Sequence, residues 1–279
     1  MNPVGPIYTA ELFLRLHTGL MAVLRDLSAD DWTRSTACSP WTVKDVAAHM
    51  LDTQVRRLSF HRDGLPVPPA DRPITSVRDL TDYLDSINDQ WVKASRRVSS
   101  RLLVDALDAT GPQLAEFFTT LDPDQPAFFS VAWAGEETSI NWFDIAREFT
   151  EQWLHQQHIR EAVGRPLLDA PDIMHPVLDT FLRALPHTYG TVEAADGTGV
   201  VLVVTGSAGG VWSLQRQEKT WRLYTGPHPA PTARVTIDQD TTWRLCTKGI
   251  SPAETQARMQ IEGDRRLGLG LLNLLSIMA

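Results

Sequence analysis

The sequence predicts an α+β protein of two domains, a helical bundle over residues 1–168 and an α+β domain over residues 169–279. Before residue 168, apolar residues recur at helical spacing in long segments, which polar or proline-rich stretches separate. After it, short β-branched runs bounded by glycine follow one another with short turns between. A chain of 279 residues is too long for one small domain and long enough for two cores.

Helix-start signals and helix-breaking residues divide the first domain into separate helices. Thr42 followed by Asp45 matches a capping box, and Ser76 is a second N-cap candidate. Gly111-Pro112 predicts a break or kink within its helix. The segment 128–136 is short and aromatic, so we expect a small hairpin or an extended lid there. The predicted helices cover residues 7–27, 43–61, 77–98 and 101–121, with a proline-rich loop at 64–73. A further long helix opens at Ser139 or Asn141 and reaches Val163.

The second domain combines strands and helices. Residues 200–205 form a β-branched run, and residues 233–238 alternate in period two. We expect these and their neighbours to build a curled antiparallel sheet. The predicted strands are 200–205, 211–214, 221–224, 233–238 and 259–262, and the predicted helices are 175–185, 241–247, 252–258 and 265–275.

Composition excludes several classes of partner. The formal net charge of −8 gives no basis for binding phosphate backbones, so we expect no nucleic-acid partner. No apolar run reaches the length of a membrane span, and the first residues lack a secretory pattern, so we expect no membrane association. Cys38 and Cys246 lie far apart and outside any zinc-ribbon spacing, which favours a reducing, cytoplasmic location.

Two stretches carry the groups that a divalent metal needs. Glu151 and His155 are four residues apart on a predicted helix, so both side chains point to one side. His49 lies on another helix whose other inward positions are apolar. Two imidazoles and a carboxylate match a metal site with three protein ligands and an open fourth position. We therefore predict His49, Glu151 and His155 as metal ligands. The alternatives are a buried histidine bonded to a backbone carbonyl and a solvated helix face rich in Glu, Gln and His.

Two more residues are candidate catalytic groups. His158 follows His155 on the same helix and is open to three interpretations: a fourth ligand, a partner of a ligand, or a base. A fourth protein ligand would close the site. Arg56 lies seven residues after His49, on the same helix face. Arginines such as Arg56 and Arg57 are, however, more often solvated surface charges than substrate clamps.

Longer motifs around these residues resemble a known family. The stretch from Trp41 to His49 (WTVKDVAAH) and the stretch from Arg147 to His155 (REFTEQWLH) are similar to the two metal motifs of DinB-like proteins, in the branch of mycothiol-dependent maleylpyruvate isomerase. Residues 233–237 (ARVTI), 243–245 (WRL) and 261–264 (IEGD) resemble the sterol-carrier-like domain attached to many members. The resemblance implies a DinB-like four-helix bundle with a C-terminal α+β sterol-carrier-like domain. It also implies zinc at the three predicted ligands.

The resemblance implies an enzyme that activates mycothiol as a thiolate for attack on a small electrophilic substrate, giving cis–trans isomerisation or S-conjugation. A divalent ion held by two imidazoles and one carboxylate keeps a positive charge, which favours a bound thiolate. The chain's own cysteines are poor candidates for this nucleophile, because Cys38 is predicted outside the helical faces and Cys246 in the other domain. A small external thiol is therefore expected as cosubstrate.

Two other functions are compatible with the same residues. A metal-dependent hydrolase would use hydroxide at the open position, with Glu148 or His158 as its base. A non-enzymatic protein would hold an apolar ligand in its C-terminal domain and use the metal only to stabilise the bundle.

Overall fold

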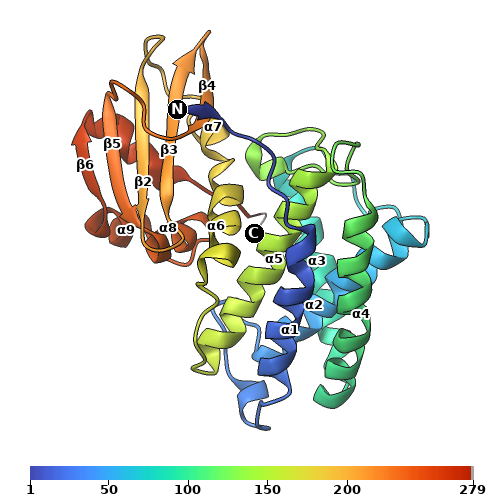
Figure 1. Ribbon diagram of the computed structural model, residues 1–279. Helices are drawn as coiled ribbons and strands as arrows, with labels where there is room; N and C mark the ends of the chain where they lie inside the picture. The colour runs from blue at the N-terminus through green and yellow to red at the C-terminus, as the bar shows by residue number, and fades with distance from the viewer. Residues whose placement is uncertain (278–279) are drawn as a thin grey trace. The chain divides into compact units, whose positions relative to one another are not determined.

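The computed structural model describes residues 1–277, which form two compact units (Figure 1). The helical unit comprises Tyr8–Phe128 and Ile140–Leu168. The second unit comprises Met1–Ile7, Phe129–Ser139 and the residues from Asp169 onward. The predicted bounds, 1–168 and 169–279, differ from these in the first residues and in the segment 129–139. The division into domains 1–168 and 169–279 stays a prediction.

Four helices of the helical unit form a closed ring. Helix α1 packs on α4 and α5, and α2 packs on the same two helices (Figure 1). Helix α3 packs on α2, where the Trp91 indole nitrogen donates to the Ala48 carbonyl at 2.8 Å. The predicted four-helix bundle is confirmed, with α3 added against it. The helices are α1 (Phe13–Leu24), α2 (Val43–Arg57), α3 (Val77–Ser95), α4 (Ser100–Thr120) and α5 (Asn141–Ala162).

The predicted capping box at the start of α2 is present. The Thr42 hydroxyl accepts from the Asp45 backbone N–H, and the Asp45 carboxylate accepts from the Thr42 backbone N–H at 3.1 Å. Two backbone donors of the first turn are thereby satisfied. After Arg57, the chain continues as one wide π-helical turn over Leu58–Arg62. The start of α2 is therefore set by local sequence, which fixes the place of His49 two turns later.

Two predicted features differ from the structure. Helix α4 runs without a break through Gly111 and Pro112, so the predicted break is wrong, and the alternative of a kink stays a prediction. A Cβ on Gly111 would lie 2.1 Å from the His17 ring, so the glycine allows α1 to approach α4 closely. The segment 128–136, which belongs to the second unit from Phe129 onward, forms no hairpin; it contains a short 3-10 turn, Ala132–Ala134, preceded by the fully buried Val131. The alternative of an extended lid stays a prediction.

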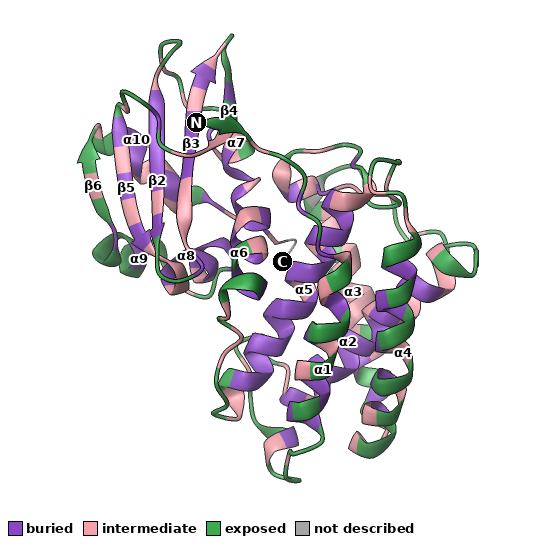
Figure 2. Cartoon of the chain, in the orientation of Figure 1, coloured by how far each residue is buried: buried purple, intermediate pink, exposed green. Residues whose placement is uncertain are grey.

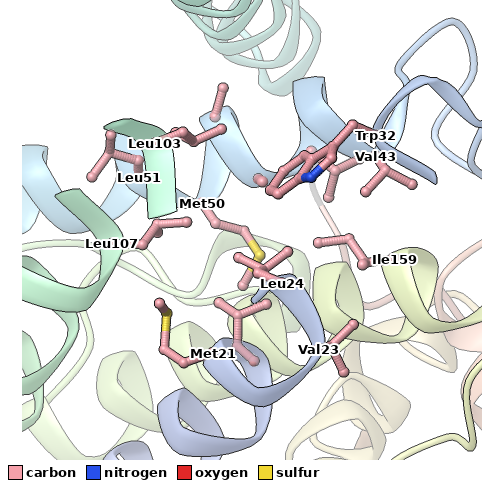
Figure 3. Close-up of a cluster of buried hydrophobic side chains, with 14 residues drawn as sticks. Met21, Val23, Leu24, Trp32, Val43, Met50, Leu51, Leu103, Leu107 and Ile159 are labelled. Carbon is pink, nitrogen blue, oxygen red and sulfur yellow. The ribbon is translucent and has the colours of Figure 1, made fainter. Parts of the chain in front are cut away.

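Apolar side chains from the ring of helices fill the core (Figure 3). Met21 and Leu24 of α1 meet Val43 and Met50 of α2 there, beside Ile159 of α5. Burial of each such side chain contributes roughly 1.5–3 kcal/mol. Helix α5 is buried along most of its length, including its polar residues (Figure 2). The alternative of a solvated helix face for α5 is therefore wrong.

The second unit is built on a six-stranded mixed sheet of order β1-β4-β3-β2-β5-β6. Most neighbours are antiparallel, but β2 and β5 are parallel. The expected purely antiparallel sheet is wrong because residues 226–232 carry the chain back to the end where β2 begins. There, the Thr232 N–H donates to the Gly199 carbonyl at 2.8 Å. The strands are β1 (Asn2–Pro3), β2 (Gly199–Thr205), β3 (Gly210–Gln217), β4 (Thr220–Thr225), β5 (Ala233–Asp238) and β6 (Gln260–Gly263).

The helices of this unit lie close to their predicted positions. The Asp238 side chain caps α8 by accepting from the Thr241 N–H at 2.8 Å. Among the described residues, no helix combines the length and apolar character that a membrane crossing requires. The helices are α6 (Pro171–Leu182), α7 (Leu185–Thr188), α8 (Gln239–Cys246), α9 (Pro252–Arg258) and α10 (Arg265–Leu269). The predicted α+β class is confirmed.

Candidate metal centre

The packing of α2 against α5 brings His49, Glu151 and His155 together. Glu151 Oε1 lies 3.3 Å from His49 Nε2 and 2.9 Å from His155 Nε2. Glu151 and His155 are one helical turn apart, and His49 faces them from the neighbouring helix. One carboxylate oxygen is thus shared by two imidazole nitrogens that come from different helices.

The distances in this group fit a divalent ion. Its three potential ligand atoms all lie within 4.8 Å of one another. Zinc ligands at about 2.0–2.1 Å in a tetrahedral arrangement are about 3.3 Å apart, close to the two separations in the group. The side chain of Glu151 is 30% exposed, whereas those of His49 and His155 are 5% and 10% exposed. The group therefore opens to solvent on its carboxylate side.

The three side chains strongly perturb one another's protonation. Burial would lower the pKa of His155, but the Glu151 carboxylate beside it raises this pKa to about 10. Burial would likewise raise the pKa of Glu151, but His155 and His49 hold it well below its ordinary value. The pKa of His49 is lowered, chiefly by burial. Without a metal ion, the group is therefore a carboxylate paired with one protonated and one neutral imidazole.

A buried ion cluster adjoins the group on α5. Arg57 donates to both carboxylate oxygens of Asp144 at 2.7 Å and to Glu148 at 3.3 Å. Arg147 also donates to Asp144 and Glu148. Burial would raise the pKa of Asp144, but the two arginines lower it to about 2. The interpretation of Arg57 as a solvated surface charge is wrong: its side chain is 4% exposed, because α5 offers two carboxylates at the level where α2 ends.

Arg56 contacts other residues. Its Nη2 donates to Asp52 Oδ2 at 2.9 Å and to Asn88 Oδ1 at 3.0 Å, so it joins α2 to α3. Its charge still contributes to lowering the pKa of His49, after burial and the neighbouring His155. The catalytic role predicted for Arg56 stays a prediction.

Cys38 lies beside the histidines of α5, a proximity that the sequence pattern does not predict. Its Sγ lies 2.9 Å from His158 Nδ1 and 3.9 Å from His155 Nδ1. The expectation that Cys38 lies away from the helical faces is wrong, because the loop before α2 folds back over α5. Its closeness in sequence to the His49 helix was the available signal. His158 is buried and faces this thiol; its predicted catalytic role stays a prediction.

The chain combines a four-helix ring and an α+β unit, and a His/Glu/His group lies between two helices of the ring. These features define a two-unit α+β protein with a candidate metal centre in its helical bundle. A family model described as the mycothiol maleylpyruvate isomerase N-terminal domain matches residues 13–160. The chain therefore belongs to the mycothiol maleylpyruvate isomerase family.

Solved structures share the fold. The crystal structure of the mycothiol-dependent maleylpyruvate isomerase matches with a TM-score of 0.53 and 12% identity, covering 86% of this chain and 88% of that chain. The crystal structure of a histidine-to-alanine mutant of that isomerase matches with a TM-score of 0.52 and 11% identity, at the same coverage. The search of curated proteins gave no significant match.

Proposed function

We propose that this chain is a zinc-dependent enzyme that activates a low-molecular-weight thiol, mycothiol, for attack on a small electrophile. The outcome is cis–trans isomerisation of a maleylpyruvate-like substrate or S-conjugation. The observation that carries the proposal is the convergence of His49 Nε2, His155 Nε2 and Glu151 Oε1. Family membership supports the thiol. Both cysteines are free, which supports the cytoplasmic location proposed with it.

A divalent ion at this group would favour the thiolate form of a thiol that reaches its open position. The chain's residues supply orientation and charge. Glu151 contacts both imidazoles through one oxygen and so directs their Nε2 atoms toward one point. Because its side chain is the most exposed of the three, we place the approach of small molecules on its side.

The two reactions differ in their last step. Attack of the thiolate on an activated double bond forms a C–S bond and moves the π electrons onto the conjugated carbonyl. Rotation about the new single bond, followed by expulsion of the thiolate, gives the isomer. Protonation of the carbanion without expulsion gives the S-conjugate.

The contacts of Glu148 favour this reaction over hydrolysis. Its carboxylate is 4% exposed and accepts from Arg57, Arg147 and Gln152. A base must be able to reach and take the proton of an attacking water. Glu148 is committed to the buried ion cluster, so the hydrolase alternative loses one of its two candidate bases.

Turnover with and without a chelator tests the proposal. We expect maleylpyruvate isomerisation, or loss of an electrophile, that requires added mycothiol and stops when the metal is chelated. Turnover should return when zinc is restored. Turnover without thiol would indicate the hydrolase. No turnover in the zinc-loaded protein with any thiol and electrophile pair would favour the binding protein. The variant His187→Ala, which changes an exposed histidine of α7, should leave this turnover unchanged.

A further inference from the structure

Backbone hydrogen bonds hold Cys38 in a closed loop before α2. Residues Ser35 and Thr42 form an antiparallel bridge at its base. Within the loop, the Trp41 N–H donates to the Cys38 carbonyl at 2.8 Å, and the Cys38 N–H donates to the Thr36 hydroxyl at 3.2 Å. The position of the thiol is therefore set by the loop and does not depend on side-chain rotation alone.

The thiol completes a second group of ligand atoms. Cys38 Sγ and one ring nitrogen from each of His155 and His158 lie within 4.8 Å of one another, and the sulfur faces Nδ1 of both rings. The two histidines are three residues apart on one face of α5, and both are buried. His155 belongs to both groups: its Nε2 faces Glu151 at 2.9 Å, and its Nδ1 faces Cys38 at 3.9 Å.

We propose that Cys38, His155 and His158 form a second metal site, selective for soft ions that prefer thiolate. Compared with the carboxylate-containing group of His49, Glu151 and His155, a thiolate with two imidazoles favours Cu(I) and other ions softer than zinc. With metal–sulfur bonds of about 2.3 Å and metal–nitrogen bonds of about 2.0–2.1 Å, sulfur and nitrogen ligands in a tetrahedral site are about 3.6 Å apart. The separations here, 2.9 Å and 3.9 Å, bracket that value.

The two sites exclude one another. A neutral imidazole has one nitrogen with a free lone pair and one that carries a proton. When His155 binds an ion through Nδ1, its Nε2–H donates to Glu151. When it binds through Nε2, its Nδ1–H is directed to Cys38. Each chain therefore holds one ion, and the softness of that ion selects the site. The second site needs neither His49 nor Glu151, so it stands independently of the proposed function.

Cadmium binding to the metal-free, full-length protein tests the proposal. Cd²⁺ is soft, and its bond to a thiolate gives a charge-transfer absorption in the ultraviolet. We expect one Cd²⁺ per chain with this band in the wild-type protein. The band should persist in Glu151→Gln and Cys246→Ala and be lost in Cys38→Ala. Cys246→Ala is the matched control, since it removes the other free thiol. His158→Ala should weaken cadmium binding by at least about 10-fold. Even the loss of a residue that only hydrogen-bonds a metal ligand typically lowers metal affinity by about 10–100-fold.

A measurement on the wild-type chain keeps the test valid should a variant misfold. Cd²⁺ should slow alkylation of Cys38 by about tenfold or more, because a metal-bound thiolate is not free to attack. Mass spectrometry of the alkylated peptides identifies the cysteine. The proposal is overturned when no thiolate–cadmium band forms, when the band survives Cys38→Ala, or when cadmium leaves Cys38 alkylation unchanged. Loss of the band in Glu151→Gln would show that Glu151 and Cys38 bind the same ion, and it would also overturn the proposal of a separate second site.

Discussion

Removal of Arg57 should destabilise the bundle strongly. The side chain makes two bonds of 2.7 Å to Asp144 and two of 3.3 Å to Glu148, and all three side chains are at most 5% exposed. The pKa of Asp144, lowered from 3.8 to about 2, corresponds to about 2 kcal/mol at roughly 1.4 kcal/mol per pKa unit. Removing one partner of a buried ion pair typically costs about 3–5 kcal/mol. We therefore expect Arg57→Ala to lose about 3 kcal/mol of unfolding free energy at pH 7.

Urea unfolding followed by far-ultraviolet circular dichroism measures this loss. The matched control is Arg96→Ala: Arg96 pairs with the buried Asp45 but is itself 54% exposed, so we expect less than about 1 kcal/mol. Because the pKa of Asp144 is lower in the folded state, its stabilisation is present above pH 3.8 and is lost as the pH falls through about 2. The difference between wild type and Arg57→Ala should shrink in acid. An equal loss in both arginine variants would refute this reasoning.

Three further predictions concern the site and its helices. Since Glu151 raises the pKa of His155 to about 10, a proton must leave His155 when zinc binds. Zinc affinity should therefore rise by about tenfold per pH unit between pH 6.5 and 8.5, and titration calorimetry in two buffers should detect one proton released. A pH-independent affinity would contradict this. His158→Ala should keep its zinc but change thiol-dependent turnover by about 10–100-fold; zinc loss as complete as in His155→Ala would show that His158 is a ligand instead. Thr42→Ala should cost about 1 kcal/mol in urea unfolding through loss of the capping box, and no measurable change would argue against the cap.

The proximity of Glu151 and His155 was accessible from the sequence because it depends on helix geometry. A spacing of four residues on a helix places Glu151 and His155 on one side of that helix, independently of the tertiary packing. The capping box at Thr42 fixes where α2 begins, and so where His49 lies. That His49 faces α5 follows from the packing of α2 on α5, which spacing alone did not establish. The ligand roles themselves stay predictions.

Features without periodicity were not accessible in this way. Cys38 reaches His158 through a loop whose bridge between Ser35 and Thr42 has no repeating sequence signal. Arg57 is buried because two carboxylates of α5 face it, which no local pattern on α2 reveals. Alternation predicted strand β5 but not its direction relative to β2, since side-chain alternation is the same in parallel and antiparallel pairs.

The central claim is that His49, Glu151 and His155 bind zinc, and the zinc content of a variant without the second site tests it most directly. In Cys38→Ala, the second site lacks its thiolate, so zinc must depend on His49, Glu151 and His155. Elemental analysis should find about one zinc per chain in Cys38→Ala, in line with a single three-ligand site. Adding His187→Ala should leave this unchanged, whereas adding His49→Ala should remove most of the zinc. Zinc that persists in Cys38→Ala/His49→Ala, or is absent from Cys38→Ala, would contradict the account.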